Sequence, residues 1–294
     1  MKSVLLVLLA TAAASLGVAG SSAAAFPTCL GETATKIGTP ADDTITGTDD
    51  DDVIVGLGGN DTIVGGGGID LICGGDGNDS IMQTSGGFFG AAIVSGDAGD
   101  DTIQAGRDTI IAADYETAPA AVNVDLTAGK ATGDGTDTLV GVDFAYGSAF
   151  DDVLTGNAKQ NVLVGLDGND TISALGGNDL LGAEAGNDTV DGGPGRDDMH
   201  YEDAPSGVHV KLVKGTATGE GSDRLKSIEN VFGSKHADVI VGGSTANTLI
   251  GGPGADRLYG LAGRDRLIGQ GGKDRADGGP GRDVCSAELR IHCP

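Results

Sequence analysis

Acidic side chains recur in this sequence at intervals of nine residues, in three separate arrays. A carboxylate that returns at a fixed spacing can bind cations repeatedly, because oxygen atoms are the ligands that hard divalent metals prefer. Asn161 and Asn247 replace aspartate at two points of the same spacing. The candidate metal ligands are Asp43, Asp52, Asp61, Asp70, Asp79, Asp101, Asp152, Asp170, Asp179, Asp188, Asp197, Asp238, Asp256, Asp265, Asp274 and Asp283.

The segments that must position these carboxylates are glycine-rich nonapeptides with the acidic residue at the sixth position. Three follow one another without a break: GLGGNDTIV from Gly56, GGGGIDLIC from Gly65 and GGDGNDSIM from Gly74. Glycine tolerates the unusual backbone dihedrals of a tight turn. The residue two positions after the acidic one is nearly always aliphatic, as at Ile63 and Leu154. The pattern predicts a turn followed by a short strand with one inward side chain.

This nonapeptide resembles the GGxGxDxUx repeat of the repeats-in-toxin (hemolysin-type) family of secreted bacterial proteins, in which U is aliphatic. The segment from Gly74 to Met82 fits at every specified position. Since that repeat is an established calcium-binding unit, the resemblance implies an all-β fold, a right-handed parallel β-roll or β-helix solenoid with several bound Ca²⁺ ions. Irregular, longer coils would lie between the arrays. Two nonapeptides would complete one coil, which stacks Asp61 on Asp79.

Stacked carboxylates would oppose folding unless a cation neutralises them. Neighbouring coils lie ~4.8 Å apart, and two carboxylates at that distance repel by roughly 1 kcal/mol in water and more at lower dielectric. Carboxylate and carbonyl oxygens in a flexible glycine turn suit the coordination of Ca²⁺, whereas Mg²⁺ requires stricter octahedral geometry. The sequence has no His or Cys cluster that would favour Zn²⁺ or Cu²⁺. Calcium ions are therefore the predicted cofactor and the predicted partner.

The arrays divide the sequence into segments, and one block of it is duplicated. Tyr115 to Ile172 matches Tyr201 to Leu258 at a constant offset of 86 residues. No change of composition marks a second, unrelated domain. The predicted segments are a signal peptide (1–25), an N-terminal cap (26–42), repeat array one with an insertion (43–114), spacer coils (115–150), repeat array two (151–200), further spacer coils (201–236), repeat array three (237–284) and a C-terminal cap (285–294).

The first 25 residues have the features of a cleavable export signal. Lys2 precedes an apolar run from Val4 to Ala14, and Ala23 to Ala25 provide an A-x-A cleavage signature. The apolar run is too short for a membrane anchor. We therefore predict a secreted, extracellular protein without membrane insertion.

Composition narrows the range of partners. The formal net charge is −25, the chain contains 54 Gly, and aromatic residues make up 3% of it. Such a chain is typical of disorder unless something neutralises its carboxylates. The sign of the charge excludes nucleic acid as a partner. An extracellular glycan or protein partner stays open.

Four cysteines form an even set, with two near each end of the repeats. Disulfides persist outside the cell. Cys285 takes the inward position of the last repeat and Cys293 lies close behind it, so we predict that this pair closes a C-terminal cap. Cys29 would then pair with Cys73. A thiolate metal site, the competing interpretation, would require a C-x-x-C spacing that is absent.

No catalytic motif accompanies the repeats. The sequence contains no HExxH, no serine stands in a GxSxG context, and the four histidines (His200, His209, His236 and His292) are isolated from one another. We predict that the protein is not an enzyme and has a structural or binding role at a surface, in a matrix or in adhesion. The alternative is an extracellular polysaccharide-acting enzyme with its site on a face of the solenoid. That enzyme would require clustered carboxylates with a basic partner on one strand face.

Overall fold

The computed structural model describes residues 27–86 and 90–293, so the predicted signal peptide lies outside the described residues. The chain is a parallel β-solenoid of about 14 coils, which confirms the predicted all-β fold class. It divides into two compact units. The N-terminal unit runs to Ala120 and includes Ala128–Tyr146, and the C-terminal unit contains Ala121–Thr127 and everything from Gly147 onward. The described residues contain no helix long and apolar enough to cross a membrane.

Two nonapeptides make one coil, because parallel strand pairs join residues that are eighteen positions apart. Thr62 pairs with Ser80 and Ile63 with Ile81, in register. Successive nonapeptides supply strands to opposite faces of the solenoid, so each face is a parallel sheet of every second strand.

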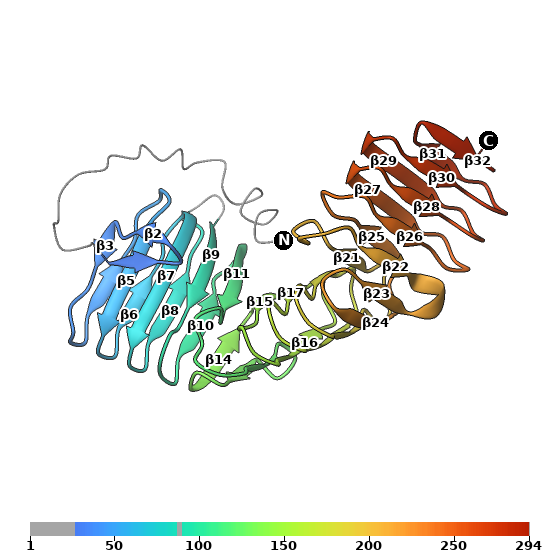
Figure 1. Ribbon diagram of the computed structural model, residues 1–294. Helices are drawn as coiled ribbons and strands as arrows, with labels where there is room; N and C mark the ends of the chain where they lie inside the picture. Colours follow the sequence, from blue (N-terminus) through green and yellow to red (C-terminus); the bar gives the residue numbers. More distant parts are fainter. Residues whose placement is uncertain (1–26, 87–89, 294) are drawn as a thin grey trace. The chain divides into compact units, whose positions relative to one another are not determined.

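In the N-terminal unit each of the two opposite faces is a stack of short strands (Figure 1). One face comprises β3 (Lys36–Ile37), β5 (Val53–Gly58), β7 (Gly68–Asp76), β9 (Gly90–Ser95), β11 (Thr109–Asp114) and β15 (Phe144–Tyr146). The other comprises β4 (Thr44–Thr46), β6 (Thr62–Val64), β8 (Ser80–Gln83), β10 (Thr102–Ala105) and β14 (Thr136–Val140). β1 (Thr28–Cys29) and β2 (Glu32–Thr33) form a separate antiparallel pair, and β13 (Lys130–Thr132) pairs antiparallel with β14.

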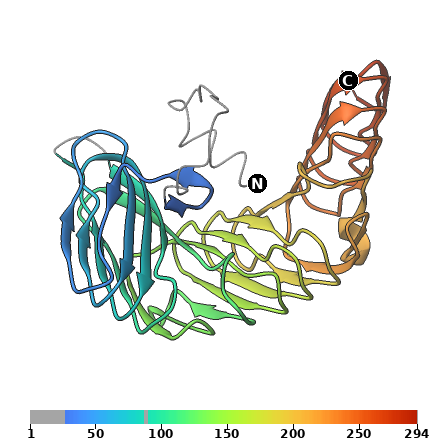
Figure 2. The ribbon, with the colours of Figure 1, turned by 60° about the vertical axis from the view of Figure 1, so that its left-hand side comes forward.

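The C-terminal unit repeats this arrangement (Figure 2). One face comprises β17 (Val162–Val164), β19 (Leu180–Gly182), β21 (Asp198–His200), β25 (Asn230–Phe232), β27 (Thr248–Gly254), β29 (Arg266–Gly272) and β31 (Val284–Ser286). The other comprises β12 (Asn123–Asp125), β16 (Val153–Asn157), β18 (Thr171–Leu175), β20 (Thr189–Asp191), β24 (Ser222–Lys226), β22 (His209–Lys211), β26 (Val239–Val241), β28 (Arg257–Tyr259), β30 (Arg275–Asp277) and β32 (Leu289–Ile291). β23 (Thr216–Thr218) pairs antiparallel with β22 and β24, and a short 3₁₀ turn spans Leu212–Lys214.

Stacked aliphatic side chains form the core of each unit. Ile63, Ile72 and Ile81 are fully buried, as are Leu163 and Leu181. Each lies two positions after a sixth-position residue, so the predicted inward position is occupied as expected. Complete burial of a side chain of this size stabilises the fold by about 1.5–3 kcal/mol. The core fixes the strands, and the strands hold the glycine-rich turns at the edges in register.

The spacers continue the solenoid as longer coils, as predicted. Ile103 pairs with Leu139 in the next coil, because the hairpin of β13 and β14 lengthens the connection. Val124 and Val210, the central residues of β12 and β22, are fully buried. The spacers therefore bury side chains in the same way as the repeats.

Two disulfides tie down the first and last coils. Cys29 bonds to Cys73 and Cys285 bonds to Cys293, with Cα–Cα distances of 5.6 Å and 5.9 Å. Both predicted pairs are confirmed. Cys29 is fully buried and packs with Val55 and Cys73.

Candidate metal centre

The sixth-position aspartates form ladders along the edges of the solenoid. In each ladder the backbone N–H of one aspartate donates to the Oδ1 atom of the aspartate one coil later. The distance is 2.7 Å from Asp61 to Asp79 and 2.9 Å from Asp265 to Asp283. Asp170 lies in the same arrangement after Asp152, at 2.8 Å. One carboxylate oxygen of each such side chain is therefore used within the fold.

The second carboxylate oxygen, Oδ2, is often left without a hydrogen-bond donor. Among the described residues, eleven sixth-position aspartates have a buried Oδ2 that accepts no hydrogen bond from the protein. These are Asp61, Asp79, Asp101, Asp170, Asp179, Asp188, Asp197, Asp256, Asp265, Asp274 and Asp283. A buried carboxylate oxygen without a partner costs several kcal/mol relative to water, so protonation or a nearby cation would stabilise each of these turns.

In five of these turns a backbone carbonyl of the next coil borders the same space as the unpaired oxygen; their aspartates are Asp61, Asp79, Asp197, Asp265 and Asp283. A Cβ atom added at Gly56 would collide with Asp61 Oδ2 and with the carbonyl oxygen of Gly74, one coil later. At Gly260 the corresponding atoms are Asp265 Oδ2 and the carbonyl oxygen of Gly278. At Gly56 and Gly260 the two oxygens thus occupy the place of a side chain, whereas the turns that end at Asp179 and Asp188 begin with alanine.

This donor set fits calcium. In the described part of the chain no three Asp, Glu, His or Cys side chains converge where they would hold a metal ion. A metal ion at one of these turns would therefore take further ligands from carbonyl oxygens beside the carboxylate. Ca²⁺ accepts such mixed oxygen coordination at 2.3–2.6 Å in a flexible geometry.

Burial and mutual repulsion make the metal-free carboxylates costly. The pKa of Asp170 is raised to about 8, first by burial and then by the charges of Asp152 and Asp188. Burial, reinforced by neighbouring carboxylates, raises the pKa of Asp101 to about 8 and that of Asp188 to about 7. A divalent cation beside these groups would favour their charged form and reverse the direction of the shift.

Four of the sequence-predicted ligands lie in turns of a different kind. Asp43, Asp52, Asp152 and Asp238 each accept a hydrogen bond at Oδ2 from the backbone N–H four residues earlier. Asp70 differs again, since Gln83 Nε2 donates to its Oδ2 at 2.8 Å. In these five turns the protein itself supplies the donor.

Several ladder residues were missing from the sequence prediction. Asp137 and Asp223 lie in the spacers, but they accept the N–H groups of Asp101 and Asp188 at 3.0 Å and 3.3 Å. The signal was present in the sequence, because TGDGTDTLV and TGEGSDRLK keep the sixth-position aspartate and the aliphatic residue after it. Glu229 and Glu288 accept the N–H groups of Asp197 and Asp274 where no aspartate follows. These glutamates lie off the nine-residue spacing, so no periodic signal marks them.

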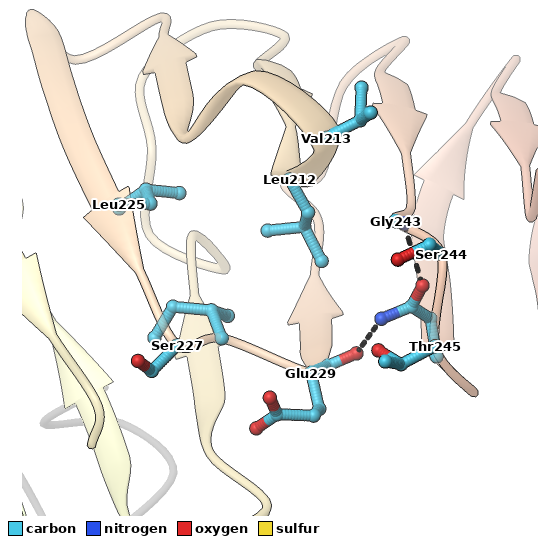
Figure 3. A pocket seen from close by; sticks show the side chains of 10 residues that line it. Leu212, Val213, Leu225, Ser227, Glu229, Gly243, Ser244 and Thr245 are labelled. Atoms are coloured by element: carbon cyan, nitrogen blue, oxygen red, sulfur yellow. Dashed lines mark hydrogen bonds between the residues drawn. The ribbon is translucent and has the colours of Figure 1, made fainter. Parts of the chain in front are cut away.

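A separate surface pocket of about 270 Å³ lies beside the second spacer (Figure 3). Leu212, Val213 and Leu225 line it together with small polar residues. Of the described residues that line it, Glu229 alone carries a carboxylate, and that side chain already accepts the Asp197 N–H. The pocket thus lacks the paired carboxylates that glycoside hydrolysis uses.

Comparison with known families assigns the chain. A model of the RTX calcium-binding nonapeptide repeat matches residues 37–72, 58–82, 86–112, 146–181, 176–203, 232–267 and 250–285. Together these matches cover more than half of the chain, which therefore belongs to this family of calcium-binding repeat proteins. The matches leave out Asp137 and Asp223. Among curated proteins, the comparison finds no match.

Proposed function

We propose that this chain is a secreted calcium-binding structural protein in which Ca²⁺ ions between successive turns hold the solenoid together. The observation that carries the proposal is the row of eleven buried, unpaired Oδ2 atoms. Five of them lie beside a glycine and a carbonyl oxygen of the next coil. The eleven aspartates of that row would be the carboxylate ligands. Calcium would neutralise charge that otherwise opposes folding.

An extracellular setting supports this proposal. The two disulfides fit an oxidising compartment, and family members are typically secreted. Extracellular calcium reaches the concentrations at which weak extracellular calcium modules are filled. A structural role at a surface, in a matrix or in adhesion suits a chain whose carboxylates serve the fold.

Circular dichroism of the chain without its first 25 residues tests the proposal. We expect a β-rich spectrum in millimolar Ca²⁺ and a largely disordered one after metal removal, because metal-binding energy contributes to folding. Elemental analysis would verify that the second sample is metal-free. Identical β-rich spectra in the two samples would refute calcium-dependent folding.

A further inference from the structure

The turns of this solenoid belong to two conformational classes. In six capped turns the N–H of the second residue donates to the sixth-position side chain, for example from Thr48 to Asp52 at 2.6 Å and from Ser234 to Asp238 at 2.7 Å. The capped turns are 38–43, 47–52, 147–152, 156–161, 233–238 and 242–247.

In the open turns the second residue has a positive φ and its N–H makes no such bond. Leu57 (φ 81°), Leu166 (φ 73°) and Gln270 (φ 72°) are non-glycine residues held in this conformation. It is uncommon for such residues. All eleven aspartates with an unpaired Oδ2 follow a second residue of positive φ. The backbone of the second residue therefore decides whether the carboxylate receives a donor.

The distribution of asparagine follows the same division. Asn161 and Asn247, the two neutral residues at the sixth position, both lie in capped turns. Asn247 Oδ1 accepts the Gly243 N–H at 2.7 Å, and its Nδ2 donates to the Glu229 carbonyl at 2.8 Å. A neutral amide thus replaces the carboxylate in two of the six capped turns, where the backbone supplies a donor. Every open turn retains the anion that a cation requires.

In two turns of open conformation, a side chain donates a hydrogen bond to the Oδ2 atom of the sixth-position aspartate. Gln83 Nε2 contacts both Asp70 Oδ2, at 2.8 Å, and the Gly66 carbonyl oxygen, at 3.3 Å. It therefore spans a carboxylate and a carbonyl, the kind of pair that a calcium ion would bridge. Tyr115 donates to Asp137 Oδ2 at 2.9 Å. In these turns an internal donor takes the place of a cation.

We propose that calcium binds only the open turns with an unpaired carboxylate oxygen, and that each array begins with one coil that folds without metal. This inference rests on the proposed function. The capped turns come in consecutive pairs at the start of each array, and two nonapeptides make one coil. Calcium-binding coils would then stack on a preformed metal-free coil, since coils in a solenoid interact with their nearest neighbours.

The test compares two substitutions one coil apart in array three. Asp238→Asn changes a capped turn and Asp256→Asn an open one, and both side chains are 1% exposed. Bound calcium would be counted by native mass spectrometry on the full chain. We expect Asp238→Asn to keep the wild-type number of ions, because the Ser234 N–H already occupies Asp238 Oδ2. Asp256→Asn should lose at least one ion.

Other outcomes separate this inference from the proposed function. A wild-type chain that binds no calcium would overturn the proposed function itself. Equal loss in the two variants, or no loss in Asp256→Asn, would overturn the division of the turns. If Asp256→Asn does not fold, Asp283→Asn replaces it. Asp283 lies in the last open turn, with Oδ2 unpaired, and the same loss of at least one ion is expected.

Discussion

At the scale of single residues, the hydrogen bonding of the Oδ2 atom distinguishes aspartates that share the sixth position of the repeat. Asp238 and Asp256 hold the same place in neighbouring coils and are equally buried. The Ser234 N–H donates to Asp238 Oδ2, whereas no donor in the described part of the chain reaches Asp256 Oδ2. An unpaired buried acceptor costs about 1–3 kcal/mol, more when charged. Calcium should therefore stabilise the turn of Asp256 and not that of Asp238.

Gln83 provides a residue-scale prediction. Gln83→Ala removes the donor from Asp70 Oδ2, which is fully buried. We expect the protein at limiting calcium to lose about 1–3 kcal/mol of unfolding free energy, and further calcium to restore part of it by entering the opened turn. Urea denaturation at limiting and at saturating calcium measures both effects. Gln104→Ala is the matched control, because Gln104 is half-buried on the neighbouring strand β10. Equal losses in the two variants would contradict the proposed role of Gln83.

At the scale of the turn, the first-position glycine sets how closely successive coils approach. Its missing side chain leaves room for the Oδ2 atom of its own turn and for a carbonyl oxygen of the next. A second-position glycine in a capped turn has no such neighbours. At Gly243 the nearest atom to an added Cβ is Asn247 Oδ1, at 3.8 Å. Position within the turn therefore matters more than residue type.

A pair of glycine substitutions tests this difference. Gly260→Ala would place Cβ 2.7 Å from the Gly278 carbonyl oxygen and against Asp265 Oδ2. We expect it to lower the unfolding free energy in calcium by about 1–3 kcal/mol, and to weaken calcium binding in the same turn. Gly243→Ala should change neither quantity. Thermal unfolding at fixed calcium provides the comparison, and equal effects of the two substitutions would disprove the steric argument.

At the scale of the whole molecule, the sequence predicted what depends on the period of the coil. The period predicted the Asp61–Asp79 stacking and the inward aliphatic residues, because both recur with it. Both disulfides could be predicted because they lie at the ends of the repeats. The hairpins shifted Asp137 and Asp223 away from the regular spacing, so only their local motif marked them. The two classes of turn were also missed, because they depend on φ at the second residue. Gly243 and Gly252 differ in φ although both are glycine.

One sequence signal could nevertheless have separated the classes. Every turn with an unpaired Oδ2 has glycine at its fourth position, as at Gly59 and Gly254. The capped turns have other residues there, as at Phe150 and His236. Gly59 and Gly254 adopt positive φ, a conformation that glycine adopts without the steric cost of a side chain. Glycine at the fourth position thus predicts the open conformation.

The raised carboxyl pKa values predict how metal-free stability depends on pH. The pKa values of Asp101 and Asp170 are raised to about 8, by burial first and by neighbouring charges second. The folded state therefore binds more protons than the unfolded state, whose Asp pKa is about 3.9. The stabilisation is complete below that value and is lost as pH rises through about 8. We expect acidification from pH 8.5 to pH 5 to shift the largely disordered metal-free protein toward the folded form and so to raise its β-sheet content.

Circular dichroism of metal-stripped protein at several pH values checks this expectation, and urea denaturation measures the stability of the calcium-loaded protein. Calcium-loaded protein is the control, because bound cations hold the carboxylates in their charged form. Its stability should fall over the same acidification, as protons compete with calcium for the carboxylate oxygens. If the folded form of the metal-free protein becomes steadily less populated toward pH 5, the raised pKa values of the buried aspartates would be contradicted.

The repeating ladder has an evolutionary consequence. The N–H groups of each coil donate to carboxylates of the next coil, and its own carboxylates accept from the coil before. A copied coil therefore finds partners on both of its sides. The block from Tyr115 to Ile172 recurs from Tyr201 to Leu258 with its hairpin included. Such a chain can lengthen by internal duplication without a new core, provided that the inserted segment contains whole coils. Selection can then act on the number of coils independently of the fold that each coil adopts.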